Sequence, residues 1–143
     1  IKLNSSGDET TDTLAVDFDA SGSPSNEVIL NNGLSYRMLI TLLLRNESQN
    51  QDVIDEGTLH QFFFDPTVPG ILDYVYADAD ANGDGIGLDG KMTVNGTGSL
   101  QLKVVLRHGL DKSNPAAEQW NSQDYNAAGG EDDLNVTFRL KAE

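Results

Sequence analysis

The sequence of 143 residues contains no cysteine. Disulfides, thiolate metal sites and cysteine nucleophiles are therefore excluded. Basic residues are scarce too, because 9 lysines and arginines stand against 23 acidic residues and give a formal net charge of −14. Such a surface repels the phosphates of nucleic acids and anionic lipid headgroups, and it attracts cations.

Long apolar runs are also absent. The longest, Met38 to Leu44, contains a threonine and is far too short to cross a bilayer as a helix. No G-x-S-x-G, Walker or dinucleotide-binding motif is present, so the sequence predicts no enzymatic activity. The chain opens at Ile1 without a methionine or a signal peptide, and we expect a processed mature domain.

What is present is a series of short segments in which apolar and polar residues alternate. This period predicts about eight strands and no convincing helix. The expected strands span residues 13–18, 27–30, 34–45, 59–64, 72–76, 91–94, 99–108 and 134–141. The inward rows are expected to be Leu100, Leu102, Val104, Leu106, Leu134, Val136, Phe138 and Leu140. The pattern predicts an all-β chain, a single antiparallel immunoglobulin-like β-sandwich over residues 1–143.

Two polar segments stand outside this pattern. Residues 1–11 read as a loose arm or an edge strand, and residues 109–133 form a long loop of the kind that often carries function. Trp120 and Tyr125 lie in that loop and are candidates for contact with a partner or ligand. The alternative is that Trp120 folds back and pins the loop onto the sandwich.

An acidic, glycine-rich loop follows residue 77. Counted from Asp78, its oxygen donors match positions one, three, five and twelve of a calcium-binding loop, with glycine at six and a carbonyl at seven. The expected Ca²⁺ ligands are Asp78, Asp80, Asn82, Asp84 and Asp89. Position twelve is aspartate, position eight is glycine, and no helices flank the loop, so we expect a calcium turn between strands. The alternative is a solvated acidic turn without an ion.

His60 and His108 are the only histidines. His60 shares the strand parity of Phe62 and Phe64, and His108 ends the apolar row that begins at Leu100. Both are expected on the core side, where a nearby carboxylate would allow a shared Zn²⁺ or Cu²⁺ site. Two ligands fall short of the usual three or four, so the sequence favours a structural role for both rings.

Four patches occur in one order along the chain: the run His60 to Phe64, the loop 78–88, the Leu106-Arg107-His108 triplet with residues 111–113, and residues 128–132. In this order they resemble a family of small Bacteroidetes lipoproteins encoded beside TonB-dependent outer-membrane receptors and often labelled periplasmic-binding-like. The lipidated N-terminal cysteine of that family is absent here. The resemblance implies a location in the periplasm, on the cell surface or outside a Gram-negative cell, and a non-enzymatic binding role.

Two functions follow from these observations. The first is a binding module that assists an outer-membrane receptor or captures a ligand, presenting loop 109–133 and the acidic loop. The second is a structural subunit of an extracellular fibre or layer, in which the arm 1–11 or an exposed strand adds to the sheet of a neighbouring copy. The oligomeric state in solution separates the two.

Overall fold

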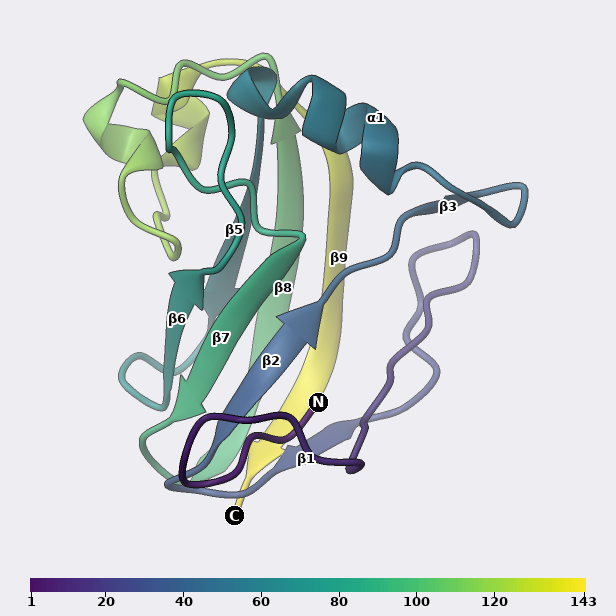
Figure 1. Ribbon diagram of the computed structural model, residues 1–143, viewed down its shortest axis with the longest axis vertical. Helices are drawn as coiled ribbons and strands as arrows, with labels where there is room; N and C mark the ends of the chain where they lie inside the picture. The colour runs from purple at the N-terminus through teal and green to yellow at the C-terminus, as the bar shows by residue number, and fades with distance from the viewer.

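Two β-sheets face each other across a common apolar core in the computed structural model, which describes residues 1–143 (Figure 1). The first sheet has the order β1 (Val28–Leu30), β9 (Glu131–Ala142), β8 (Gly98–His108) and β5 (His60–Pro66). The second has the order β2 (Ser35–Leu39), β7 (Asp89–Val94) and β6 (Leu72–Tyr76). A hairpin of β3 (Leu43–Leu44) and β4 (Glu47–Ser48) precedes the helix α1 (Asn50–Asp55), and three 3₁₀ turns are η1 (Gly57–Leu59), η2 (Pro115–Ala117) and η3 (Tyr125–Ala128).

The predicted all-β class is confirmed, with two differences of detail. There are nine strands, and the pairing is not purely antiparallel, because β1 runs parallel to β9 with Val28 opposite Leu140. The six residues of α1 form a short helix, which the alternating pattern does not predict. No helix has the length and apolar character needed to cross a membrane.

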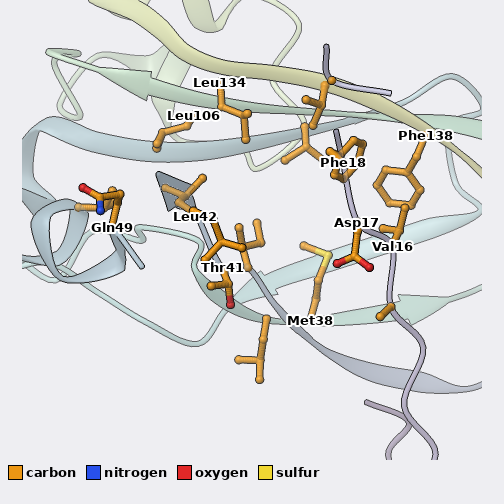
Figure 2. Close-up of a pocket in the computed structure, with 18 of the residues that line it drawn as sticks. Val16, Asp17, Phe18, Met38, Thr41, Leu42, Gln49, Leu106, Leu134 and Phe138 are labelled. Atoms are coloured by element: carbon orange, nitrogen blue, oxygen red, sulfur yellow. The ribbon is translucent and has the colours of Figure 1, made fainter. Parts of the chain in front are cut away.

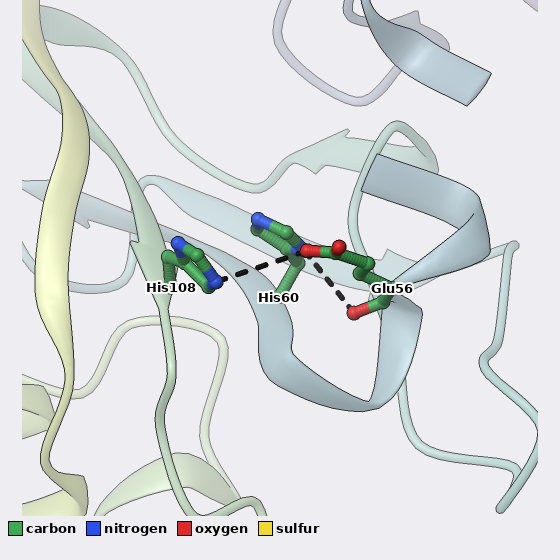
Figure 3. A group of neighbouring side chains, drawn as sticks. All are labelled: Glu56, His60 and His108. Atoms are coloured by element: carbon green, nitrogen blue, oxygen red, sulfur yellow. Dashed lines mark hydrogen bonds and ion pairs between the residues drawn. The ribbon is translucent and has the colours of Figure 1, made fainter. Parts of the chain in front are cut away.

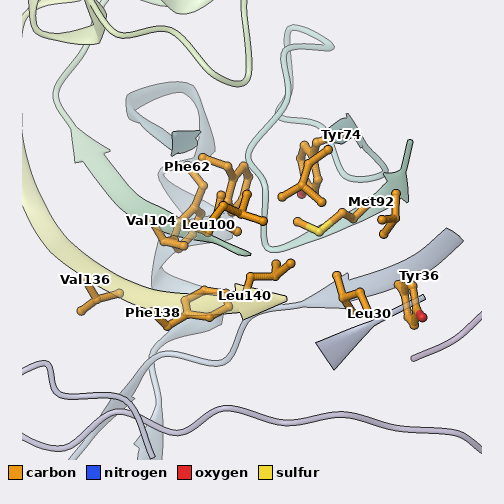
Figure 4. Packing of buried hydrophobic residues seen from close by; sticks show 14 of the residues in the cluster. Leu30, Tyr36, Phe62, Tyr74, Met92, Leu100, Val104, Val136, Phe138 and Leu140 are labelled. Atoms are coloured by element: carbon orange, nitrogen blue, oxygen red, sulfur yellow. The ribbon is translucent and has the colours of Figure 1, made fainter. Parts of the chain in front are cut away.

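The predicted inward rows of β8 and β9 form the centre of the core (Figure 4). Their alternation places one face of each strand against the second sheet, and seven of the eight predicted residues are buried. The eighth, Leu134, is half-buried and still packs against the cluster. Phe62 and Phe64 from β5 join this layer with no exposed surface.

The expected strand at 13–18 is wrong. Residues 13–26 instead form an irregular hairpin, which we call the flap, with a single bridge between Phe18 and Pro24. No backbone hydrogen bond joins the flap to either sheet. Val16 and Phe18 nevertheless pack against the core. The alternation of apolar and polar residues therefore indicates which side of this segment is buried, and not that the segment pairs as a strand.

The expected strand at 34–45 is wrong in extent, and the part that does pair lies at the edge of its sheet. Regular pairing ends at Leu39, and β2 pairs with β7 alone among the strands. The chain then leaves the sheet and reverses at Arg45 and Asn46, whose φ values are 53° and 68°. The leucines of this segment therefore lie at an edge, and Leu43 is 64% exposed.

Residues 1–11 form an addition to the edge of the second sheet. Lys2 bridges Tyr36, the Leu3 amide donates to the Ser35 carbonyl at 2.9 Å, and Leu3 itself is buried. The arm thus lies against this chain's own β2.

Loop 109–133 folds back over the outer face of the first sheet. A second apolar cluster joins Phe63 of β5 and Val105 of β8 to Leu110, Ala117, Tyr125 and Ala128 of the loop. Arg107 fixes the end of the loop, because its guanidinium donates to the carbonyls of Gly129 and Gly130 and pairs with Asp132 at 2.6 Å.

Candidate functional site

An apolar cleft lies between the inner face of β5, β8 and β9 and the segment from β2 to β3. Its volume is about 1320 Å³, and 23 of its 35 lining residues are hydrophobic, so its interior favours an apolar occupant. Figure 2 shows Leu106 and Leu134 on one wall, with Met38 and Leu42 on the facing wall.

The flap covers part of this cleft. The ring of Phe18 meets Phe138 edge to face with centroids 6.0 Å apart (Figure 2). Gly22 approaches the side chain of Val136. Within the flap, the Ser25 amide donates to the Asp17 carbonyl at 2.7 Å. Because only side-chain packing attaches the flap to the sheets, it can separate from them without breaking a strand ladder.

Exposed apolar side chains gather at the cleft. Four large residues that line it are between 49% and 64% exposed: Leu14, Leu39, Leu43 and Leu44. A contiguous exposed apolar patch next to a concave cavity is typical of a binding site rather than of a solvated surface.

One end of the cleft is polar. We call the four side chains there the histidine–carboxylate cluster: Glu56, His60, His108 and Asp133. One donor atom from each of Glu56, His60 and His108 lies within 4.8 Å of the other two (Figure 3). The Asp133 Oδ2 atom is 3.7 Å from His60 Nε2 and 3.5 Å from His108 Nδ1.

Strand register brings the two histidines together. His60 and His108 are directly opposite each other at the end of the β5–β8 ladder, and their rings stack with centroids 4.5 Å apart. His60 is buried, and its Nδ1 lies 3.1 Å from the main-chain carbonyl oxygen of Glu56. The predicted placement of both rings on the core side is thus observed, and the structure joins them into one pair.

Two members of the cluster escape prediction from the sequence. Glu56 immediately follows α1, and its position depends on how that short helix meets β5. Asp133 sits at a register shift between β8 and β9, where Leu106 pairs with Leu134 but Arg107 pairs with Asp132. This β-bulge turns a side chain that regular alternation would direct away from the histidines. Neither the end of the short helix nor the β-bulge produces a periodic pattern in the sequence.

The acidic loop is held by contacts within the protein. Both carboxylate oxygens of Asp78 accept backbone amides, from Gly87 at 2.7 Å and Leu88 at 2.8 Å. Asp80 accepts the amides of Asn82 and Asp84 through one oxygen. Its loop carboxylates form no group of three with donor atoms within 4.8 Å of one another. Calcium binding there stays a prediction, which melting curves in EDTA and in millimolar calcium would test.

A buried ion pair anchors this loop to loop 109–133. Lys112 Nζ lies 3.0 Å from Asp80 Oδ2 and donates to the Gly85 carbonyl at 2.9 Å, and both charged side chains are almost fully buried. Burial acts to raise the pKa of Asp80, but the hydrogen bonds from Lys112 and from the loop amides outweigh it, and the pKa is lowered.

Asp89 forms an ion pair with a different basic side chain. Arg37 of β2 binds it through two nitrogens, at 2.9 and 2.6 Å, and also pairs with Glu9 of the arm. The hydrogen bonds to Asp89, and then to Glu9, raise the pKa of the Arg37 guanidinium above its ordinary value. Arg37 and Lys112 thus supply positive charge to two of the five expected calcium ligands, Asp89 and Asp80.

The loop aromatics pack inward. Tyr125 is 5% exposed, and its ring stacks on Phe63 at 5.3 Å. Trp120 packs near Tyr74, and its carbonyl accepts the amide of Phe64 at 2.8 Å. Trp120 therefore pins the loop onto the sandwich, and the buried ring of Tyr125 presents no surface to a partner.

In comparisons with protein-family models, with curated proteins and with solved structures, no match to this chain was found.

Proposed function

We propose that this protein is a non-enzymatic binding module that holds a small amphipathic molecule in the cleft between its sheets. The observation that carries the proposal is the apolar cavity of about 1320 Å³ under a flap attached by side-chain packing alone. Ligand sites are concave, mostly apolar and lined by a few polar groups that set orientation. This cleft has that composition, with its histidine–carboxylate cluster confined to one end.

The charges lining the cleft define the preferred head group of the ligand. Five acidic side chains line it: Asp17, Asp19, Asp52, Glu56 and Asp133. Arg37 is the only lysine or arginine in the lining, and it already pairs with Asp89 and Glu9. A ligand with an apolar body and a positively charged or hydrogen-bond-donating head is therefore favoured over an anionic one.

The volume of the cleft indicates how large the apolar part of the ligand is. Sites for drug-sized molecules measure roughly 300–1,000 Å³, and this cleft exceeds that range. A molecule with a long alkyl chain or several fused rings fits better than a single amino acid or sugar.

Titration with an apolar fluorescent probe tests the proposal. We expect saturable binding of one dodecylammonium-type amphiphile per chain, measured by displacement of the probe. Leu42→Trp places a large side chain in the cleft from a half-buried position and should weaken binding at least tenfold. An amphiphile with a carboxylate head should bind more weakly than the ammonium compound.

The control is Val68→Trp, which adds the same side chain at an exposed position outside the cleft. This variant should bind as the wild type does. Equal binding by both tryptophan variants, or the absence of saturable binding by the wild type, would contradict the proposal.

A second candidate is a subunit assembled by strand addition, and the free edge of β9 favours it. β1 pairs only with Leu140 to Ala142, and no backbone hydrogen bond joins the outer edge of residues 131–139 to another segment. An apolar cleft beside an unpaired strand can receive an extended peptide from a second copy.

The resemblance to envelope lipoproteins supports a place for this module outside the cytoplasm, where it would pass its ligand to an outer-membrane receptor. That location, the receptor and the immunoglobulin-like class of the sandwich are parts of the proposal. Two facing sheets of four and three strands support the last of these.

A further inference from the structure

Asparagine is followed directly by glycine at three places in the chain: Asn32, Asn82 and Asn95. In such a pair the backbone nitrogen of the glycine can attack the carboxamide carbon of the asparagine side chain, because glycine has no Cβ atom to obstruct the approach. All three asparagines are exposed to solvent. The three sites therefore differ chiefly in what binds the nitrogen of the glycine.

Two of the three glycine nitrogens are held by backbone hydrogen bonds. The Gly33 amide donates to the Val94 carbonyl at 2.8 Å, and the Gly83 amide donates to the Asp80 carbonyl at 3.1 Å. Both glycines also have a positive φ, of 79° and 92°, which fixes them in tight turns. Attack on the neighbouring side chain requires the glycine peptide plane to rotate, so each of these hydrogen bonds must first break.

The third glycine, Gly96, lacks this restraint. It lies in a bend between β7 and β8, and its amide donates to no backbone carbonyl of the protein. The amide of Asn95 itself donates to the Ile71 carbonyl at 2.8 Å. Asn95 is therefore held on its N-terminal side, while no hydrogen bond has to break before the peptide plane that follows it turns.

We propose that Asn95 is the site at which the folded protein is modified by spontaneous deamidation. The Gly96 nitrogen loses its proton as it bonds to Cγ of Asn95, and ammonia leaves with that proton, which gives a five-membered succinimide. Water then adds to one of the two ring carbonyls and opens the ring to aspartate or to isoaspartate. In isoaspartate the chain continues through the former side chain, so the backbone gains one carbon atom.

The place of Asn95 in the fold gives this modification a structural effect. Residues 95–97 are the whole connection between β7 of the second sheet and β8 of the first. An additional backbone atom there disturbs the hydrogen bond to the Ile71 carbonyl or the pairing of Gly98 with Ala142. We therefore expect the isoaspartate form to unfold at a lower urea concentration than the wild type. Asn95→Asp, which has the new charge but a normal backbone, should unfold as the wild type does.

Ageing of the folded protein in mildly alkaline buffer, followed by trypsin digestion and tandem mass spectrometry, tests the proposal. Cleavage after lysine and arginine places the three sites in separate peptides, 3–37, 46–91 and 92–103. In the folded protein Asn95 should be modified at least about fivefold faster than Asn32 or Asn82, the factor that corresponds to one hydrogen bond of about 1 kcal/mol. In concentrated urea, where the hydrogen bonds of the other two glycines are lost, the three rates should agree within about twofold.

Gly96→Ala is the matched variant. Its Cβ atom would lie 3.6 Å from the Ile71 side chain, an ordinary contact, and Gly96 does not have a positive φ, so the fold accepts alanine there. The added methyl group obstructs the approach of the nitrogen and should slow modification of Asn95. Equal rates at the three sites of the folded protein, or an unchanged rate at Asn95 in Gly96→Ala, would overturn the proposal. Asn95 does not line the cleft, so this result is independent of the amphiphile experiment.

Discussion

The side chain of Tyr74 illustrates how closely single residues are fitted in the second sheet. Its hydroxyl is buried without a hydrogen-bond partner and lies against Gly90, where a Cβ atom would come within 2.0 Å of the oxygen. Only glycine therefore fits at position 90. Burial, reinforced by the charges of Tyr76, Asp78 and Asp89, raises the pKa of this phenol above its ordinary value.

We expect Tyr74→Phe to stabilise the protein by about 1 kcal/mol, because it removes a buried hydroxyl that has no partner. Tyr76→Phe is the matched control. The Tyr76 hydroxyl donates to the Phe62 carbonyl at 2.6 Å, so its loss should cost about 1 kcal/mol or more. Urea unfolding measures both changes, and a destabilised Tyr74→Phe variant would show that the hydroxyl has a partner after all.

For a single residue, the sequence predicts which face of its strand the side chain lies on, but not which side chains of other strands it contacts. Period-two parity placed the rows of β8 and β9 correctly, and it put His60 and His108 on the core side. Their pairing depends on the β5–β8 register, and the contribution of Asp133 depends on a bulge. Both are set by contacts between segments far apart in the chain, which a single-strand pattern does not contain.

The position of the acidic loop in the fold depends on the Asp80–Lys112 ion pair. A carboxyl whose pKa is lowered by folding stabilises the folded state above its unfolded pKa of about 3.9, and that stability is lost as the pH falls through the lower folded value. Asp80→Asn leaves Lys112 buried without its counter-charge and should cost about 3–5 kcal/mol at pH 7. The difference from wild type should shrink below pH 4.

Urea unfolding between pH 7 and pH 2.5 checks this prediction. Asp84→Asn in the same loop is exposed and should change stability by less than about 0.5 kcal/mol at pH 7. A deficit for Asp80→Asn that stays constant down to the lowest pH would mean that folding does not lower the pKa of Asp80.

Among the elements, the long paired strands were predictable and the segments around the cleft were not. β8 and β9 carry alternation over 11 and 12 residues, and each strand pairs with a long partner. The flap has the same alternation over a shorter span, yet lacks a neighbouring strand to bond with. The leucines of residues 39–44 line the cleft, and most of them are exposed there. A prediction from local hydrophobicity alone therefore wrongly assigns them to a buried strand.

For the molecule as a whole, the oligomeric state distinguishes the two candidate functions. We expect the wild type to stay monomeric in light scattering, since the flap covers part of the cleft and a charge of −14 keeps copies apart. Phe18→Ser should loosen the flap, because it removes the aromatic contact with Phe138, and should produce concentration-dependent association. Polymers formed by the wild type itself would favour strand addition.

The place of β9 in the chain has a consequence for biosynthesis. It is synthesised after both β1 and β8, yet it lies between them in its sheet (Figure 1). Leu30 pairs with Ala142, 112 positions later (142 − 30), so β1 cannot join the first sheet until β9 has been synthesised. Contacts of such long sequence separation slow folding and leave apolar surface uncovered meanwhile. The nascent chain therefore depends on its acidic residues, or on a chaperone, to stay soluble until β9 has been synthesised.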